Sequence, residues 1–377
     1  MKTLTETQVR LIASAQSWVE PEALRQLFAI SNLDGISHVV GFPDLHPGKR
    51  TPVGAAFVTQ GVIYPQLIGD DVGCGMSLFS TDLSLRSAGL VDEWAGVRFN
   101  LEHPWDESVD NILAENGSES TEFDEELGTI GGGNHFAELQ VVEEVLNTRA
   151  FRKTGLSKAR LVLLVHGGSR GLGESIGSVH REGYIANGLA DDSSAAATWL
   201  RDHEAAVRWA KLNRELIARR FMAALGAEAE CLWDGCHNSI TRTEADGETA
   251  WIHRKGAVDS AAQFVVIPGS RGSLSYVAKP VGDSESHAWS LAHGAGRKWV
   301  RSEARLRMRK RFSRHELVQT RLGGRVVCEE RDLLYEEAPA AYKNIDVVVQ
   351  DLVDAGLVSV IATLRPLFTY KTRKQQR

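Results

Sequence analysis

Cysteine is scarce in this chain of 377 residues, and its four cysteines show no paired spacing. Cys231 and Cys236 lack the two-residue gap of a zinc knuckle, so the thiols are expected to be reduced, as in the cytosol. The sequence also has no apolar leader and no run of about 18 uncharged apolar residues. These absences predict a cytoplasmic protein with neither a secretion signal nor a membrane partner.

An excess of positive charge is also missing. The formal net charge is -6, which argues against a chain that coats nucleic acid without specificity. One stretch departs from this average, because between residues 297 and 325 only Glu303 and Glu316 offset many basic residues. Two interpretations stay open, a surface that contacts phosphates and a solvated amphipathic helix.

No internal repeat, low-complexity segment or linker divides the chain, which predicts a single domain over residues 1–377 with its motifs between about 35 and 371. Hydrophobic residues make up 43% of the chain, enough for a large core. Apolar runs alternate with helical patterns and Gly-rich polar loops. This alternation predicts an α/β fold of central β-sheets flanked by helices, with the active-site loops at strand ends.

The periodicity predicts individual elements. Helices are expected over residues 21–30 and 198–225, and strands over 53–58, 62–68, 139–142, 161–165, 250–252 and 264–267. Prolines and glycines predict a loop over 41–48 that exposes Asp44 and His46. Residues 84–128 are polar, acidic and helix-prone, which predicts a surface excursion with little chemistry.

One short turn carries a carboxylate and a thiol three positions apart, Asp71 and Cys74, among glycines. Alone, this turn is explained as well by a capping Asp and a small buried Cys. Histidines recur in similar Gly-rich or polar loops, where packing explains them poorly, at His135, His166, His237 and His293. Taken together, these residues predict a metal cluster in which one thiolate bridges two ions. The mixed S, N and O donors suit Zn, Mn, Fe or Co.

The loop Gly167–Gly173 offers a competing interpretation. It follows a strand and has the glycine spacing of the phosphate loop of short-chain dehydrogenases. It lies about 160 residues into the chain, whereas such a domain begins close to its phosphate loop. An oxidoreductase is therefore disfavoured.

Nine motifs together carry a family resemblance. They occur in the order seen in the RtcB family of RNA ligases, at Pro43–Gly48, Asp71–Gly75, Gly131–Phe136, His166–Gly171, His237–Asn238, Arg254–Ala257, Ile267–Ser270, His293–Arg297 and Glu336–Lys343. The short N-terminus and the residues of the first motif resemble those of the bacterial subgroup linked to peptide chain release factor H.

The resemblance implies a role for each cluster residue. A cysteine matching Cys74 bridges two Mn ions in the family; His166 and His237 match the ligands of one ion, and Asp71 and His135 those of the other. His293 matches the nucleophile that attacks the α-phosphorus of GTP and becomes guanylylated. The implied cofactors are thus two Mn²⁺ per subunit and GTP.

The resemblance also implies nucleotide contacts, at Asn134, His135, Phe136, Ala137, Glu138, Asn238, Pro268, Gly269, Ser270, Arg271, Ser275, Gly294, Ala295, Gly296 and Lys371. Two of these positions depart from the family: Arg271 stands where Met is usual, and the chain continues past Lys371. Charge and loop position make four further residues candidates for binding RNA phosphates or for structural ion pairs, namely Arg170, Arg254, Lys255 and Arg297.

The implied function is a GTP- and Mn-dependent RNA ligase. It joins RNA 3'-phosphate or 2',3'-cyclic phosphate ends to 5'-hydroxyl ends, in tRNA splicing or RNA repair, with tRNA or ribosomal RNA as partner. Two other classes stay open: a metal-dependent RNA end hydrolase, and a non-catalytic RNA-binding relative.

Overall fold

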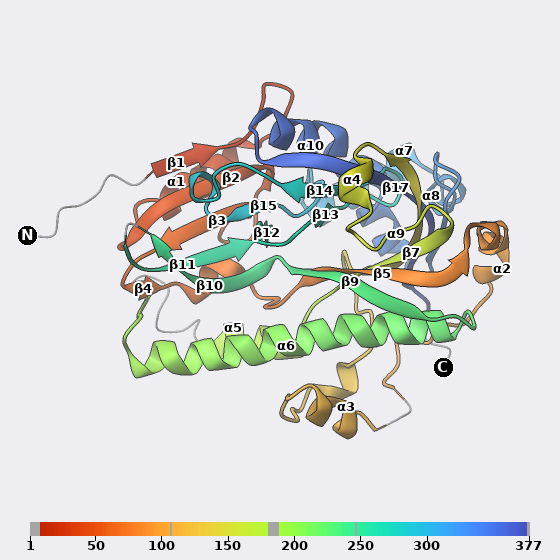
Figure 1. Cartoon of the computed structure of the whole chain (residues 1–377), viewed down its shortest axis with the longest axis horizontal. Coiled ribbons are helices and arrows are strands. Elements are labelled where there is room, and N and C mark those ends of the chain that lie inside the picture. Colours follow the sequence, from red (N-terminus) through yellow and green to blue (C-terminus); the bar gives the residue numbers. More distant parts are fainter. Residues whose placement is uncertain (1–7, 106–107, 180–187, 246, 375–377) are drawn as a thin grey trace, which may run out of the picture.

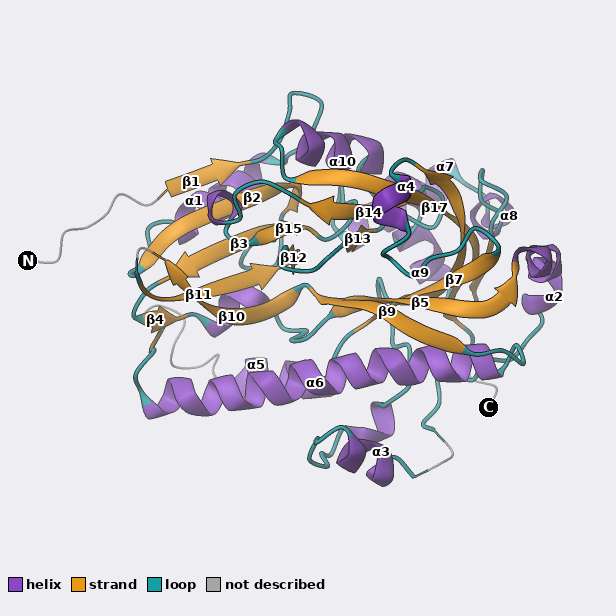
Figure 2. Ribbon diagram, in the orientation of Figure 1, coloured by secondary structure: helices purple, strands orange, loops and turns teal. Residues whose placement is uncertain are grey.

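The computed structural model describes residues 8–105, 108–179, 188–245 and 247–374 (Figure 1). Its strands and helices intermingle along the chain, and most strands gather in two sheets (Figure 2). The predicted α/β class is confirmed. The prediction of one domain over residues 1–377 stays a prediction.

The larger sheet has eight strands. Seven follow one another in the order β13-β14-β17-β6-β7-β5-β9, and β16 pairs with β17. Every pairing along that path is antiparallel. The strands are β5 (Gly75–Ser84), β6 (Phe136–Val145), β7 (Arg160–Gly167), β9 (Ala229–Cys236), β13 (Val265–Ile267), β14 (Ser275–Pro280), β16 (Arg325–Cys328) and β17 (Val358–Thr372).

The second sheet has five strands in the order β1-β2-β3-β11-β10. They are β1 (Gln8–Leu11), β2 (Ile36–His46), β3 (Val53–Thr59), β10 (Asn238–Ala245) and β11 (Glu248–Lys255). Two small ribbons complete the strands, one formed by β4 (Val62–Ile63) with β8 (Leu189–Ala190) and the other by β12 (Ala257–Asp259) with β15 (Ser290–Ala292).

Helices cover the outer faces of the sheets. The 30-residue α6 (Ser194–Ala223) runs along one side of the molecule and packs on β5, β7 and β9 (Figure 1). The Ser193 side chain caps its start by accepting from the Ala196 amide. The other helices are α1 (Pro21–Ile30), α2 (Val91–Trp94), α3 (Asp110–Glu115), α4 (Thr148–Phe151), α5 (Gly171–Val179), α7 (Arg301–Arg311), α8 (Arg314–Val318), α9 (Arg331–Glu336) and α10 (Ile345–Asp354). No helix in the described ranges is long and apolar enough to cross a membrane.

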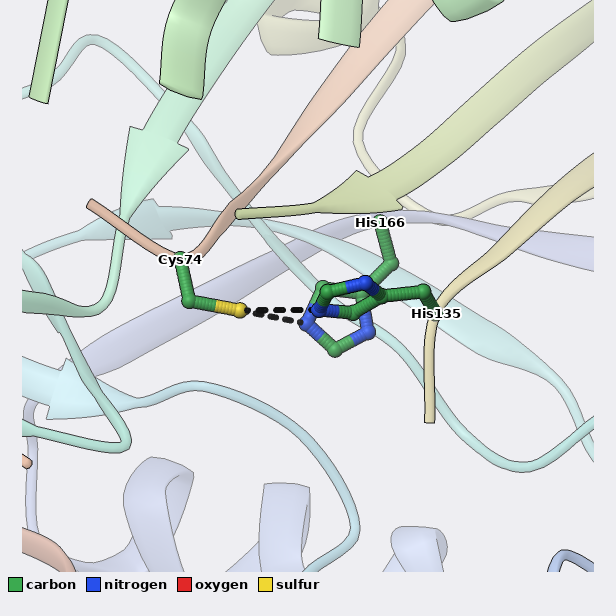
Figure 3. Close-up of side chains that lie close together, drawn as sticks. All are labelled: Cys74, His135 and His166. Carbon is green, nitrogen blue, oxygen red and sulfur yellow. Dashed lines mark hydrogen bonds between the residues drawn. The ribbon is translucent and has the colours of Figure 1, made fainter. Parts of the chain in front are cut away.

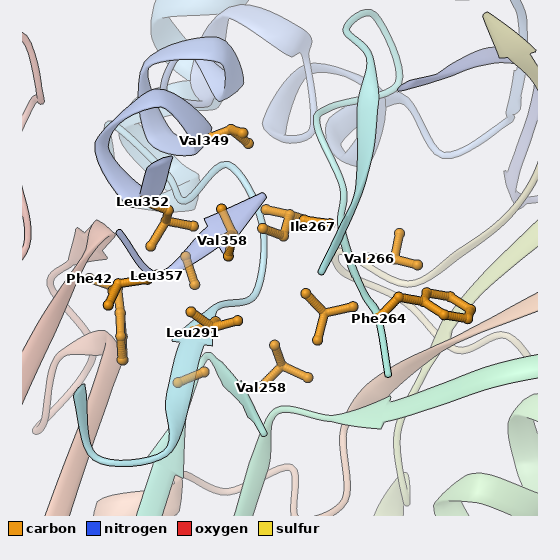
Figure 4. Packing of buried hydrophobic residues seen from close by; sticks show 14 of the residues in the cluster. Phe42, Val258, Phe264, Val266, Ile267, Leu291, Val349, Leu352, Leu357 and Val358 are labelled. Atoms are coloured by element: carbon orange, nitrogen blue, oxygen red, sulfur yellow. The ribbon is translucent and has the colours of Figure 1, made fainter. Parts of the chain in front are cut away.

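The largest core cluster joins the two sheets. Phe42 from β2, Val266 from β13, Leu291 from β15 and Leu352 from α10 pack in it (Figure 4). All four side chains are at most 1% exposed. This shared core fixes β2 and β15 against the larger sheet, and the residues that follow β15 begin the His293 loop.

Most predicted elements are confirmed. The helix over 21–30 is α1 with the same bounds, and the helix over 198–225 is α6. The single strand over 62–68 is wrong, because β4 ends after two residues and Pro65 begins a 3-10 turn, Pro65–Ile68. The predicted loop over 41–48 is also wrong, since β2 continues to His46 and Asp44 is fully buried.

The excursion over 84–128 lies partly at the surface, as predicted, in short helical turns. Phe99 and Leu101 nevertheless enter the core beside α6 and β17, and Phe99 stacks on Phe221 with ring centroids 4.4 Å apart. At the end of this segment, Glu126 lies 3.4 Å from Arg170. The excursion therefore contributes packing and a contact close to the His166 loop.

Arg214 of α6 holds two loops in place. Its guanidinium is fully buried and lies 2.8 Å from the Asp234 carboxylate. One terminal nitrogen, Nη1, donates to the carbonyls of Gly73 at 2.9 Å and Gly167 at 3.0 Å. A side chain from the helix thus links the loops that follow Asp71 and His166.

Replacing Arg214 with Met is expected to lower the free energy of unfolding by about 3–5 kcal/mol, because it leaves Asp234 and two loop carbonyls unpaired in the interior. Urea unfolding measures the change. Arg201→Met is the matched control on the same helix, since the Arg201 side chain is 71% exposed. Equal stability of the two variants would contradict a structural role for Arg214.

Candidate metal centre and adjoining pocket

The turn that carries Asp71 and Cys74 is packed tightly. Gly73 adopts a φ of +78°, and a Cβ there would lie 2.9 Å from the Cβ of Ala210. A Cβ on Gly75 would lie 2.5 Å from the Gly235 carbonyl oxygen. Only glycine fits at these two places, so the turn lies directly against α6 and β9.

Strand register brings the cluster together. β5 begins at Gly75, which pairs with Gly167 at the end of β7 and with Cys236 at the end of β9. β6 begins at Phe136, which pairs with His166. Cys74, His135 and His237 each adjoin one of these strand ends, so all of them lie at the same edge of the larger sheet.

The thiol faces two imidazoles that lie side by side (Figure 3). Cys74 Sγ is 3.5 Å from His135 Nε2 and 3.3 Å from His166 Nε2 (Figure 3). All three side chains are buried, and their ligand atoms lie within 4.8 Å of one another. The structure thus brings together three of the five predicted ligands as a compact group.

The other two predicted ligands adjoin this group. Asp71 Oδ2 is 3.3 Å from His135 Nε2. The His237 ring lies 5.1 Å from the His166 ring and 4.7 Å from the His293 ring, measured between centroids. The cluster therefore continues from the carboxylate through three imidazoles to His293.

Backbone carbonyls fix how two of the rings face the cluster. His135 Nδ1 lies 3.1 Å from the Ile130 carbonyl, and His166 Nδ1 lies 3.2 Å from the Asn134 carbonyl. A carbonyl only accepts, so each Nδ1 donates and each Nε2 keeps a lone pair directed at the thiol. A ring held at one nitrogen by a carbonyl, with the other nitrogen left to bind, is typical of metal-binding histidines.

The protonation states of the cluster side chains also favour binding of a cation. Burial and neighbouring imidazoles hold the pKa of His166 and of His237 well below the ordinary value, so both rings are neutral. Burial raises the pKa of the Cys74 thiol, and the Asp71 carboxylate adds to that effect. A bound divalent ion would stabilise the thiolate and so lower the pKa that burial and Asp71 raise. The oxygen Asp71 Oδ1 has no hydrogen-bond partner among the described residues and is free to bind such an ion.

His293 is held by a buried carboxylate. Its Nδ1 lies 2.6 Å from Asp44 Oδ2, and Asp44 is fully buried. The carboxylate accepts from Nδ1, which leaves Nε2 with the lone pair, as a nucleophile requires. Sequence reasoning placed Asp44 in an exposed loop and missed this contact.

Several groups fix Asp44 itself. Lys343 Nζ donates to the carbonyls of Pro43 and Leu45 on either side of it. A Cβ on Gly296, whose φ is +68°, would lie 2.3 Å from the Asp44 carbonyl oxygen. The His293 loop therefore lies directly on the strand that carries the carboxylate.

A pocket of about 260 Å³ opens beside His166 and His293. Most of the predicted nucleotide contacts line it: Asn134, Phe136, Glu138, Pro268, Gly269, Ser270, Arg271, Gly294, Ala295, Gly296 and Lys371. Its wall also includes residues that the sequence analysis did not assign to nucleotide binding, namely His46, Val53, Met76, Arg301, Glu337, Tyr342 and Thr369.

Four predicted nucleotide contacts do not line this pocket among the described residues. His135 belongs to the metal cluster, and Ala137 lies in the core. Asn238 donates to the Asp71 carbonyl and accepts from the Gly256 amide, and Ser275 accepts from Gln140. Their roles toward a nucleotide stay predictions.

Charges of both signs meet at the far wall of the pocket. Glu337 accepts from Arg297 at 2.8 Å and lies 3.8 Å from Lys371 Nζ. Burial disfavours the charged form of Glu337 and so raises its pKa, but these two cations outweigh burial and hold the pKa below the usual value. Lys371, next to the last residue of β17, is 3% exposed and lines the pocket.

The four candidate RNA-phosphate residues differ in availability. Arg254 is 1% exposed and donates to Ser290, Thr241 and the Trp289 carbonyl, and these contacts fit the structural alternative that the sequence left open. The other three are at least partly accessible. Lys255 donates to Thr51 and is half-buried, and burial lowers its pKa to about 8.

Arg170 and Arg297 lie beside predicted site residues. Arg170 directly follows the His166 loop and packs over Gly131, where a Cβ would lie 1.9 Å from its Nη1. Arg297 lines the pocket. The basic stretch over 297–325 forms α7 and α8, and Arg305 and Arg309 of α7 pair with Asp332 of α9. Ion pairs with a neighbouring helix thus account for part of its charge.

A buried thiol with two buried imidazoles and an adjoining, partly exposed carboxylate, next to a charged pocket, is typical of a metal-binding α/β protein. Comparisons with known proteins give the family. The family model described as tRNA-splicing ligase RtcB matches residues 26–121 and 106–372. The chain belongs to the RtcB family of RNA-splicing ligases.

Individual relatives cover nearly the whole chain. The RNA-splicing ligase RtcB2 of Escherichia coli ATCC 25922 is 41% identical over 365 residues, which are 96% of this chain and 94% of the relative. The RNA-splicing ligase RtcB of Escherichia coli K12 is 28% identical, over 94% of this chain and 95% of its own. The tRNA-splicing ligase RtcB of Thermococcus kodakarensis is 28% identical, over 92% and 90%.

Replacing Cys74 with Ser is expected to weaken metal binding at least about 10-fold, because a hydroxyl stays protonated where the thiolate would bind. Metal content after dialysis against a Mn²⁺ buffer, measured by plasma mass spectrometry, checks this. Cys231→Ser is the matched control, since Cys231 is exposed. Unchanged stoichiometry in the Cys74 variant would remove this residue from the site.

Proposed function

We propose that this protein is a GTP- and Mn-dependent RNA ligase. It joins RNA 3'-phosphate or 2',3'-cyclic phosphate ends to 5'-hydroxyl ends through a guanylylated histidine. The observation that carries the proposal is that His293, oriented by Asp44, lines the same pocket as His166 of the metal cluster. A nucleophile and a metal ligand thus face one space.

The cluster would hold two Mn²⁺ ions. Cys74 is the shared ligand, His166 and His237 complete one site, and Asp71 and His135 complete the other. The ions supply positive charge that offsets the phosphates of GTP as pyrophosphate leaves. Neutral imidazoles and a shared thiolate fit this task, because they bind without bringing extra positive charge.

His293 performs the first step. Its Nε2 attacks the α-phosphorus of GTP, a nitrogen–phosphorus bond forms, and the bond to the pyrophosphate oxygen breaks. Positive charge develops on the imidazole, and the Asp44 carboxylate at Nδ1 stabilises it. The glycines beside Ala295 let the backbone approach the nucleotide closely.

The RNA then takes the guanylate. The 3'-phosphate receives it from His293, and the 5'-hydroxyl attacks the activated end with loss of GMP; a cyclic phosphate is first opened to the 3'-phosphate. Arg170, Lys255 and Arg297 are the candidates that remain for contacts with RNA phosphates. The RNA is a tRNA or ribosomal RNA fragment in the cytoplasm, and a functional link to release factor H belongs to this proposal.

Incubation with α-labelled GTP and Mn²⁺, followed by denaturing electrophoresis, tests the first step. The wild-type protein is expected to retain an acid-labile label, and His293→Ala is expected to lose it because the nitrogen nucleophile is gone. A wild-type protein that takes up no label with Mn²⁺ or another divalent ion would overturn the ligase. Opening of cyclic phosphates without labelling would favour an RNA end hydrolase.

Replacing Asp44 with Asn is expected to slow guanylylation about 100-fold or more, because an amide does not stabilise positive charge at Nδ1. Single-turnover labelling at saturating GTP measures the rate. Asp346→Asn is the matched control, since Asp346 is exposed and its carboxylate accepts a hydrogen bond from Tyr276, away from the pocket lining. An unchanged rate in the Asp44 variant would confine this carboxylate to a structural role.

A further inference from the structure

The connection between β6 and β7 is strongly basic. Residues 147–160 contain no acidic residue, although the whole chain has a net charge of -6. Every lysine and arginine in this segment is exposed: Arg149, Arg152, Lys153, Lys158 and Arg160. The segment is therefore a positively charged part of the surface of an acidic protein.

Apolar and polar side chains hold this segment in a fixed conformation. Phe151 and Leu156 belong to the packing of the largest core cluster, and α4 lies against β17 (Figure 1). Asn147 caps α4 by accepting from the Ala150 amide, and Thr154 Oγ1 donates to the Phe151 carbonyl at 2.8 Å. A ligand that binds the exposed cations would thus lose little affinity to ordering of the backbone.

Three cations share one pocket of about 440 Å³. Arg149 and Lys153 line it from this segment, and Lys279 lines it from β14. Gln263 and Phe264 form another part of the wall. No carboxylate lines this pocket among the residues that the structure describes. A hollow with positive charge and no acid attracts an anion.

No carboxylate within the described part of the chain forms an ion pair with Arg149, Lys153 or Lys279. The acidic residues nearest to the segment in the sequence are Glu143 and Glu144, and Glu143 lies 2.7 Å from Arg365 Nε instead. Like charges around one pocket repel one another. A bound anion would remove that repulsion.

This basic pocket lies at the other end of the strands from the nucleotide pocket. β6 begins at Phe136, which lines the nucleotide pocket, and Asn147, two residues after its end, lines the basic one. Strand β17 connects the two in the same way, through Ile361 and Lys371. About ten strand residues separate the pockets, which is roughly 30 Å.

We propose that Arg149, Lys153 and Lys279 bind the phosphate backbone of the RNA, roughly 30 Å from the end that is joined. This inference rests on the proposed function, which supplies RNA as the ligand and places its end beside His293. Lysine and arginine contacts to phosphates carry no sequence information, so the site adds affinity without selecting bases. Stacked nucleotides advance about 3.4 Å each, so only an RNA of about nine or more reaches both pockets when stacked.

RNAs of about 5 and about 20 nucleotides, each with a 3'-phosphate, test the proposal in binding measurements by fluorescence anisotropy. Replacing Arg149, Lys153 and Lys279 together with Gln is expected to raise the dissociation constant of the long RNA about 10-fold. The slope of its logarithm against that of the salt concentration is expected to fall by about 2, because three phosphate contacts are lost. Affinity for the short RNA and labelling with GTP are expected to stay at the wild-type values.

The matched control removes the same charge from another surface. It replaces Arg201, Arg208 and Lys211, exposed residues of α6, with Gln. An equal loss of affinity for the long RNA in this control, or no loss in the Arg149, Lys153 and Lys279 variant, would overturn the proposal. Polyglutamate that displaces the long RNA better than unlabelled RNA does would also overturn it, in favour of an acidic protein partner.

These measurements separate the basic pocket from the ligase. A wild-type protein that takes up no label, but whose affinity for the long RNA depends on the three cations, would contradict the ligase and retain the phosphate site. A protein that takes up label and binds the long RNA equally well without the three cations would do the reverse.

Discussion

The contact between Arg214 and the carbonyls of Gly73 and Gly167 underlies the rest of the site. These carbonyls belong to the segments that carry Cys74 and His166, and these segments adjoin the strand ends where Gly75 of β5 pairs with Gly167 of β7. Asp234 fixes the guanidinium from the neighbouring strand β9. A thiol and an imidazole 3.3 Å apart therefore depend on a guanidinium from α6 that a carboxylate of the larger sheet holds in place.

The metal cluster and His293, the proposed nucleophile, are built by different sheets. Cys74, His135, His166 and His237 come from one edge of the larger sheet, whereas His293 follows the ribbon strand β15 and is oriented by Asp44 of the second sheet. The shared core, with Phe42 and Leu291 in contact with residues of the larger sheet, fixes these two parts together. The pocket is the space where they meet, and its far wall is closed by the ends of β13 and β17.

The sequence predicts the residues of the metal cluster better than it predicts the residues that hold the site in place, and the reasons are physical. Histidines beside glycines are poorly explained by packing, so His135 and His166 stand out, and the structure brings both to Cys74. Asp44 does not stand out, because Pro43 and Gly48 favour a loop locally while pairing with β3 and the contact to Lys343 hold it in a strand. Arg254 looks available from charge alone, but its partners Thr241 and Ser290 are distant in sequence. Partners that are distant in sequence leave no pattern near a residue from which its contacts could be predicted.

Strand β17 lies inside the larger sheet, between β14 and β6, although it follows every other described strand in the sequence. It pairs with β6, β14 and β16, and the Glu143–Arg365 contact spans 222 positions. During synthesis on the ribosome, β6 and β14 are thus made long before their common neighbour, with their backbone edges unsatisfied. A growing chain of this protein would be prone to aggregate through those edges until translation passes Thr372.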